Sequence, residues 1–97
     1  MNVRQLEKNR YSVFTDDLTT CIICKKPKSD LHEVLYGTNR LNSIKYGYVI
    51  PVCRNCHIWL HKDRNFTLFW VRKCQRRFEM DHDREEWLRV FKKNYLD

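Results

Sequence analysis

The chain is poor in the residues and segments that mark several classes of protein. Two glycines and two prolines in 97 residues exclude linker-like or collagen-like material. No apolar run approaches the ~18 residues that suggest a membrane-spanning helix. The first segment, MNVRQLEKNRYSVF, lacks the apolar stretch of a secretory signal peptide. We therefore expect a protein that is made and kept in the cytosol, with no membrane partner.

Size and cysteine content point to a small domain that uses a metal. A chain of 97 residues with 42% apolar and 32% charged residues is expected to form one soluble domain. Five cysteines in a reducing compartment are more often metal ligands or spare thiols than disulfides. A metal is therefore expected to fix the loops of the domain.

The net charge is strongly positive. Nineteen Lys and Arg residues against 12 Asp and Glu give a net charge of +7 and a pI near 9.3. A basic domain of this size often neutralises nucleic-acid phosphates, because each contact releases counterions and adds affinity. Solubility alone is the alternative explanation. The balance favours nucleic acid as the partner.

The apolar pattern predicts an α+β fold with a β-hairpin in the first half. Residues 31–36 (LHEVLY) and 46–52 (YGYVIPV) are rich in β-branched and aromatic residues, which is typical of strands. They are close enough in sequence to pair antiparallel, and Pro51 lies near the end of the second strand. Residues 37–45 (GTNRLNSIK) are predicted to be a polar basic loop between them.

The second half is predicted to be helical. A short helix is expected over residues 53–62, and residues 66–80 carry apolar side chains four positions apart, as on one face of a helix. Asp83 is expected to cap a last helix, with Glu86 completing a capping box. The single domain of residues 1–97 then has three parts: an N-terminal extension (1–16), a core (17–63) and a helical tail (64–97). For the N-terminal extension, the sequence is equally compatible with a short helix and with a strand.

Two CxxC pairs are the strongest motif. Cys21 and Cys24 form the first, and Cys53 and Cys56 form the second, with 28 residues between them. The two thiolates of such a pair can bind the same ion from a tight turn, and two pairs together complete a tetrahedron around one Zn²⁺. Four thiolates leave no open position, so this zinc is expected to be structural. Cys74, the fifth cysteine, lies in the apolar helix pattern and is expected in the core.

Three histidines form a second candidate metal site. His57 and His61 are one helical turn apart, so their imidazoles face the same way. His32 lies on the first predicted strand, which a zinc held by both knuckles would bring beside this helix. The three rings would then converge on one ion. Two alternatives stay open: exposed helix residues, or a zinc site made of Cys21, Cys24, His57 and His61.

This order of motifs resembles the HNH, or ββα-metal, endonuclease family in its zinc-knuckle branch. The matching segments are CIIC, LHEVLYG, YGYVIPVC and CRNCHIWLH, within residues 21–63. The whole chain is similar to small phage- or prophage-encoded HNH-like proteins. The resemblance implies a zinc-stabilised ββα-metal core, an antiparallel hairpin plus a helix, with additional C-terminal helices. It also implies a metal-dependent DNA endonuclease in the cytoplasm of a bacterial host, with double- or single-stranded DNA as its partner.

The resemblance also assigns roles to residues. The family's first motif is commonly a metal ligand followed by a histidine base. In the favoured register, His32, His57 and His61 therefore bind a catalytic divalent ion (Mg²⁺, Mn²⁺, Ni²⁺ or Zn²⁺), and Glu33 stands at the position of the base. In the other register His32 is the base, and Leu31 stands at a ligand position that leucine cannot fill. Catalytic roles thus fall on His32 and Glu33.

Substrate binding is assigned to basic residues around the expected hairpin and metal helix. The candidates are Arg40, Lys45, Arg54, Lys62 and Arg64. Side chains that track phosphates rarely reach a base edge, so weak sequence preference is expected.

Two other classes of function stay open. Glu33 in place of the usual histidine favours a catalytically inactive, HNH-like DNA-binding module. The other alternative is a protein-interaction or inhibitor protein on the same scaffold. An exposed apolar patch at Trp59, Phe69 or Trp70 would support such a protein partner.

Overall fold

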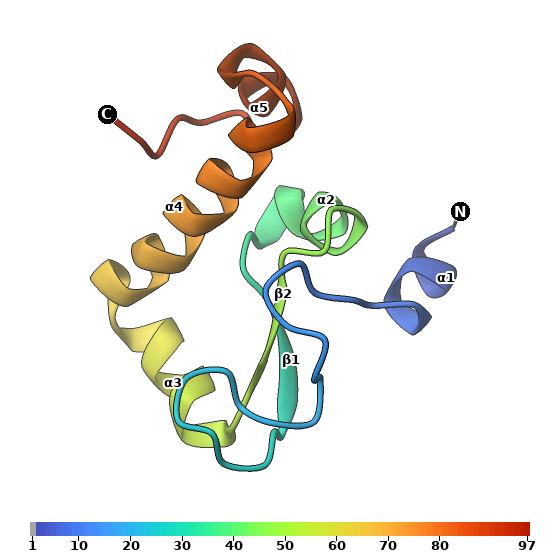
Figure 1. Ribbon diagram of the computed structural model, residues 1–97, viewed down its shortest axis with the longest axis vertical. Helices are drawn as coiled ribbons and strands as arrows, with labels where there is room; N and C mark the ends of the chain where they lie inside the picture. Colours follow the sequence, from blue (N-terminus) through green and yellow to red (C-terminus); the bar gives the residue numbers. More distant parts are fainter. Residues whose placement is uncertain (1) are drawn as a thin grey trace.

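The computed structural model describes residues 2–97, which form an α+β fold around one two-stranded antiparallel hairpin (Figure 1). In chain order the elements are α1 (Val3–Lys8), β1 (Asp30–Glu33), the 3₁₀ turn η1 (Gly37–Asn39), α2 (Arg40–Lys45), β2 (Val49–Val52), α3 (Arg54–Lys62), α4 (Arg64–Asp81) and α5 (Arg84–Phe91). The expected α+β class, the hairpin and the helical second half are confirmed.

The hairpin register decides which side chains face the helices. His32 of β1 pairs with Ile50 of β2, and Glu33 pairs with Val49. Because successive side chains of a strand point to opposite faces, His32 and Glu33 lie on different sides of the hairpin. Both strands are shorter than predicted, because β1 ends at Glu33 and β2 begins at Val49.

The connection between the strands corrects one prediction. Residues 37–45 were expected to be a loop, but they contain η1 and helix α2. The buried Ser43 hydroxyl donates to the Tyr48 carbonyl at 2.7 Å and accepts from the Leu35 amide at 3.1 Å. These contacts join both ends of the connection. A six-residue helix with so few apolar side chains shows no helical period in the sequence.

Side-chain caps start the three C-terminal helices. The Cys53 sulfur accepts from the Cys56 amide at the start of α3, and the Asp63 carboxylate accepts from the Phe66 amide at the start of α4. Asp83 caps α5 through the Glu86 amide, as predicted. The Glu86 side chain pairs with Arg89 and does not complete the predicted capping box.

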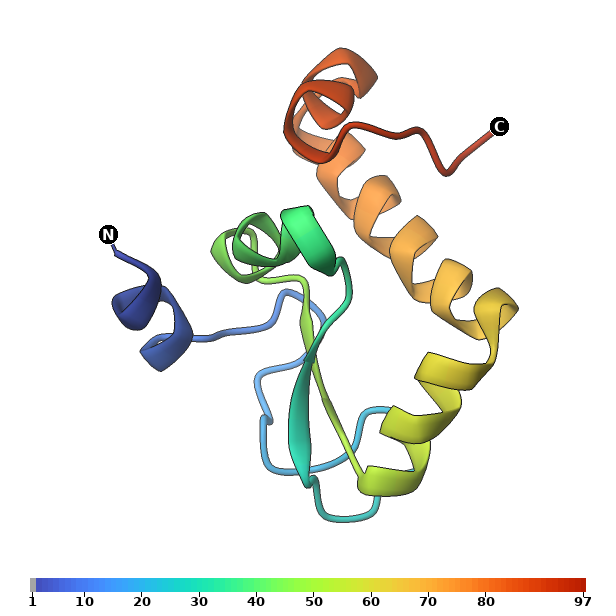
Figure 2. The same ribbon diagram turned by 180° about the vertical axis from the view of Figure 1, so that it is seen from behind.

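The core lies between the hairpin and the inner faces of α4 and α5. Trp87, Phe78 and Phe91 are almost fully buried there, and Cys74 is buried with them, as expected from the apolar pattern. Figure 2 shows α4 running from α3 to α5, with the C-terminal segment returning beside it. The Tyr95 amide donates to the Gln75 side chain of α4 at 2.8 Å, which fixes that segment. In the described part of the chain, no helix is long and apolar enough to cross a membrane.

Candidate metal centres

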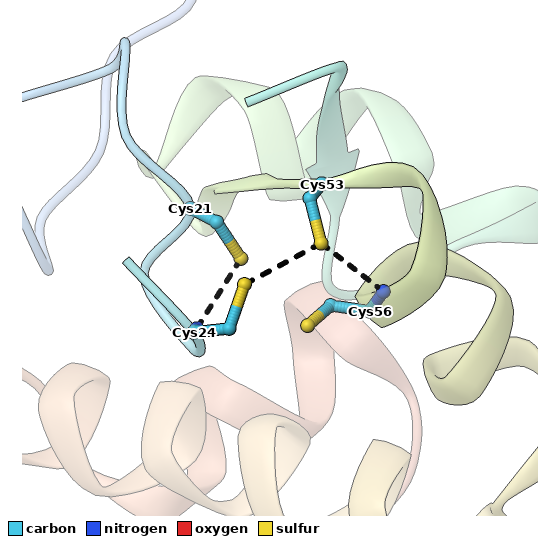
Figure 3. A group of neighbouring side chains, drawn as sticks. All are labelled: Cys21, Cys24, Cys53 and Cys56. Carbon is cyan, nitrogen blue, oxygen red and sulfur yellow. Dashed lines mark hydrogen bonds between the residues drawn. The ribbon is translucent and has the colours of Figure 1, made fainter. Parts of the chain in front are cut away.

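Four cysteines from two distant segments meet where β2 leads into α3 (Figure 3). The sulfurs of Cys21, Cys24, Cys53 and Cys56 all lie within 4.8 Å of one another. Cys24 Sγ and Cys53 Sγ are 3.5 Å apart. Tetrahedral zinc with Zn–S bonds of ~2.3 Å requires sulfurs roughly 3.8 Å apart. The group is near enough to hold one metal ion, and its donor set is consistent with a structural zinc.

Backbone geometry holds each cysteine pair in a tight knuckle. The Cys24 amide points at Cys21 Sγ and the Cys56 amide at Cys53 Sγ, both at 3.5 Å. Lys25, directly after the first pair, has a φ of 69°, the left-handed conformation that turns the chain sharply. Each knuckle is therefore shaped by its own backbone.

The thiols of this group respond differently to their surroundings. Burial raises the pKa of Cys21, but the amides of Cys24, Cys53 and Ile23 outweigh it and hold the pKa at about 6. Burial and the three neighbouring cysteines raise the pKa of Cys56. The raised pKa of Cys56 opposes a thiolate at that position, and a bound cation would offset the negative charge.

Three histidines converge beside the cysteine group. His32 of β1 and both histidines of α3, His57 and His61, each place one ring nitrogen within 4.8 Å of the others. The His32 ring centroid lies 5.1 Å from that of His57 and 5.6 Å from that of His61. Since His57 and His61 group with His32, the alternative site with Cys21 and Cys24 is not formed.

A carboxylate behind His57 orients its ring. Asp30 Oδ2 lies 3.0 Å from His57 Nδ1 and 3.4 Å from Arg54 Nε. The hydrogen bond from His57, opposed by partial burial and helped by the charge of Arg54, lowers the pKa of Asp30. With Nδ1 donating to Asp30, Nε2 of His57 carries the free lone pair, as in many metal-binding histidines.

The His32 imidazole is neutral at ordinary pH. Burial, followed by the charges of His57 and His61, lowers the pKa of His32 to about 4. Its imidazole therefore keeps a lone pair that can bind a metal. His61 is exposed, so the group opens to solvent on one side.

The structure does not bring Glu33 to the histidine group. Glu33 Oε1 lies 2.7 Å from Arg10 Nη2 and 3.3 Å from Arg40 Nη2, on the opposite side of the hairpin from His32. Glu7 also pairs with Arg40, at 3.2 Å. Glu33 therefore anchors the N-terminal segment to the hairpin and is separated from the histidine group.

The basic residues that were expected to bind substrate fall into two groups. Lys62 and Arg64 are exposed near His61, at the junction of α3 and α4. Arg40 and Arg54 are engaged in ion pairs with Glu33 and Asp30, whereas Lys45 is exposed at the end of α2. Of the apolar candidates for a protein partner, Trp59 and Phe69 are about half exposed, whereas Trp70 is buried.

Sequence reasoning missed two contributors to this region. Asp30 begins β1, two residues before His32. In the sequence, this position on the same strand as His32 was the only signal that indicated a role for Asp30. Arg10 reaches Glu33 across 23 positions of sequence, so no local pattern could have revealed it.

Comparisons with family models, curated proteins and solved structures found no match to this chain. The functional argument therefore depends on the chemistry of the two groups that could hold a metal.

Proposed function

We propose that the protein is a divalent-metal-dependent DNA endonuclease of the HNH type. The observation that carries the proposal is the group of His32, His57 and His61, with Asp30 behind it. Three imidazole ligands leave an open coordination position, as catalytic metal sites do, whereas four cysteines leave none. The histidine group then holds the catalytic ion, and the cysteine group holds a structural zinc. The hairpin and α3 correspond to the ββα-metal core.

The arrangement suits hydrolysis of a phosphodiester. A bound ion supplies Lewis-acid stabilisation of the phosphate and lowers the pKa of water. Asp30 keeps the His57 ring in one tautomer and one orientation. Lys62 and Arg64 place positive charge beside the open side of the histidine group, where a phosphate would approach. Glu33, held by two arginines, takes no part in this scheme.

DNA affinity is expected to fall steeply with salt. If four exposed cations contact duplex phosphates, affinity falls roughly 150-fold between 50 and 200 mM salt. Lys62→Gln should lower the slope of log K against log salt by about 0.9, because one contact is lost. Lys8→Gln on α1 is the matched control and should leave the slope unchanged. Fluorescence anisotropy with labelled duplex measures both, and salt-independent binding would contradict the proposal.

Glu33→Gln tests the structural role of this carboxylate. The change removes a charged partner from Arg10 and Arg40, which should lower the free energy of unfolding by about 1–3 kcal/mol. Cleavage by the folded variant should change less than tenfold. A general base would instead cost ~10²–10⁴-fold in rate. Urea unfolding and single-turnover cleavage separate these results, with the exposed Glu85→Gln as the control.

The engagement of Glu33 favours one alternative, a DNA-binding protein that does not cut. The same histidine group would then be a second structural metal site. Incubating the protein with plasmid and with single-stranded DNA in Mg²⁺, Mn²⁺, Ni²⁺ or Zn²⁺ decides between them. Cleavage that depends on an added ion supports the endonuclease, and binding without cleavage under every ion supports the alternative.

A further inference from the structure

A cavity of about 360 Å³ opens next to the histidine group. It lies between the end of β1, the junction of α3 and α4, and the segment that follows α5. His32 and His61 form part of its wall, so anything bound in it lies beside the proposed catalytic ion. Its volume is at the lower end of the ~300–1,000 Å³ typical of small-molecule sites. It therefore takes one nucleotide-sized group.

The charged residues lining this cavity are all cations. Lys62 and Arg64 approach from the helix junction, and Lys93 approaches from the C-terminal segment. Within residues 2–97, no aspartate or glutamate lines it. A recess with one sign of charge and low-dielectric walls concentrates ligands of the opposite sign, which here are anions. Phosphate is the anion expected beside a site that hydrolyses phosphodiesters.

Two tyrosines give the cavity an aromatic surface. Tyr36, which immediately precedes η1, is 64% exposed. Tyr95 lies on the opposite segment, held by hydrogen bonds to Arg72 and Gln75 of α4. Burial and the neighbouring Tyr36 raise the pKa of Tyr95, so its hydroxyl remains a donor at neutral pH. Exposed aromatic rings next to cations are the usual platform for unpaired bases.

We infer that this cavity binds one unpaired nucleotide of single-stranded DNA next to the scissile phosphate. Its base lies against Tyr36 and Tyr95, and its phosphate contacts Lys62, Arg64 and Lys93. In a duplex the base faces are covered by stacking, so an aromatic recess discriminates in favour of single strands. This inference rests on the proposed function, because it defines the substrate of the same site.

The test compares binding of a labelled single strand and of its duplex to the zinc-loaded full chain, without added divalent ion. We expect at least tenfold tighter binding of the single strand. Tyr36→Ala should weaken single-strand binding roughly 5- to 150-fold, the effect of losing one base–aromatic stack. Duplex binding should change less than twofold. Phe69→Ala, which removes a similarly exposed ring outside the cavity, is the matched control and should change neither.

A second pair of variants tests the phosphate contact. Lys93→Gln should lower the single-strand salt slope by about 0.7, whereas Lys8→Gln should leave it unchanged. Equal affinity for single strand and duplex, or equal effects of Tyr36→Ala and Phe69→Ala, would overturn the inference. Cleavage assays report separately on the proposed function. Tyr36-dependent single-strand binding without cleavage under any ion would refute the endonuclease and retain the nucleotide site.

Discussion

Replacing Cys21 with serine is expected to leave most of the chain unfolded. One of the four sulfurs that lie within 4.8 Å of each other would be lost. Structural zinc contributes an apparent ~10–16 kcal/mol to small zinc domains, which is comparable with the whole stability of an ordinary domain. Circular dichroism should show loss of helix, and metal analysis should fall from one tightly held zinc per chain to near zero.

The fifth cysteine provides the control for this result. Cys74 is fully buried in the core and outside the cysteine group. Cys74→Ala should keep the zinc and cost about 1 kcal/mol of stability, as for a small loss of packing. A wild-type protein that loses no stability when its zinc is removed would refute a structural role for the metal.

Replacing His61 with alanine is expected to abolish ion-dependent cleavage while the fold is retained. His61 is exposed, so its loss removes a ligand and little packing. Cleavage should fall by more than the roughly 10- to 100-fold that losing an outer-shell partner costs. Titration with Ni²⁺ should show weaker binding of the second ion, and the tightly held zinc should stay in place.

Two further variants are expected to affect cleavage less than His61→Ala does, or not at all. Asp30→Asn weakens the support of His57 and should cost roughly 10- to 100-fold in ion affinity or in cleavage. His82→Ala removes an exposed histidine that stacks on Phe78, outside the group, and should leave cleavage unchanged. If His61→Ala cleaved as fast as His82→Ala, the histidine group would not be the catalytic site.

The ligand groups could be predicted from the sequence because their spacing is local. Two residues between cysteines fix a knuckle, and four positions between His57 and His61 fix one helix face. His32 is distant in sequence, but linking the two knuckles carries β1 to α3. The cysteine grouping thus constrained where the third histidine must lie.

Other features depend on contacts that no local pattern encodes. Helix α2 owes its place to the Ser43 hydroxyl, which bonds to both ends of the connection. Glu33 looked like a base by its position next to His32, yet strand geometry turns it to the other face. The cavity was missed because Tyr36 and Lys93, which both line it, are far apart in sequence. Lys93 is near it because the C-terminal segment is bonded to Gln75 of α4 through the Tyr95 amide.

Cys56 and His57 are consecutive residues of α3, so we expect the two proposed metal centres to fill and empty in a fixed order. The cysteine centre assembles the helix end on which the histidine centre depends. Each knuckle is shaped by its own backbone, and the cysteine group includes no histidine. Mild chelation should therefore inactivate the protein reversibly, and re-addition of the ion should restore it at once. Stronger chelation should empty both centres, and recovery should then be as slow as refolding.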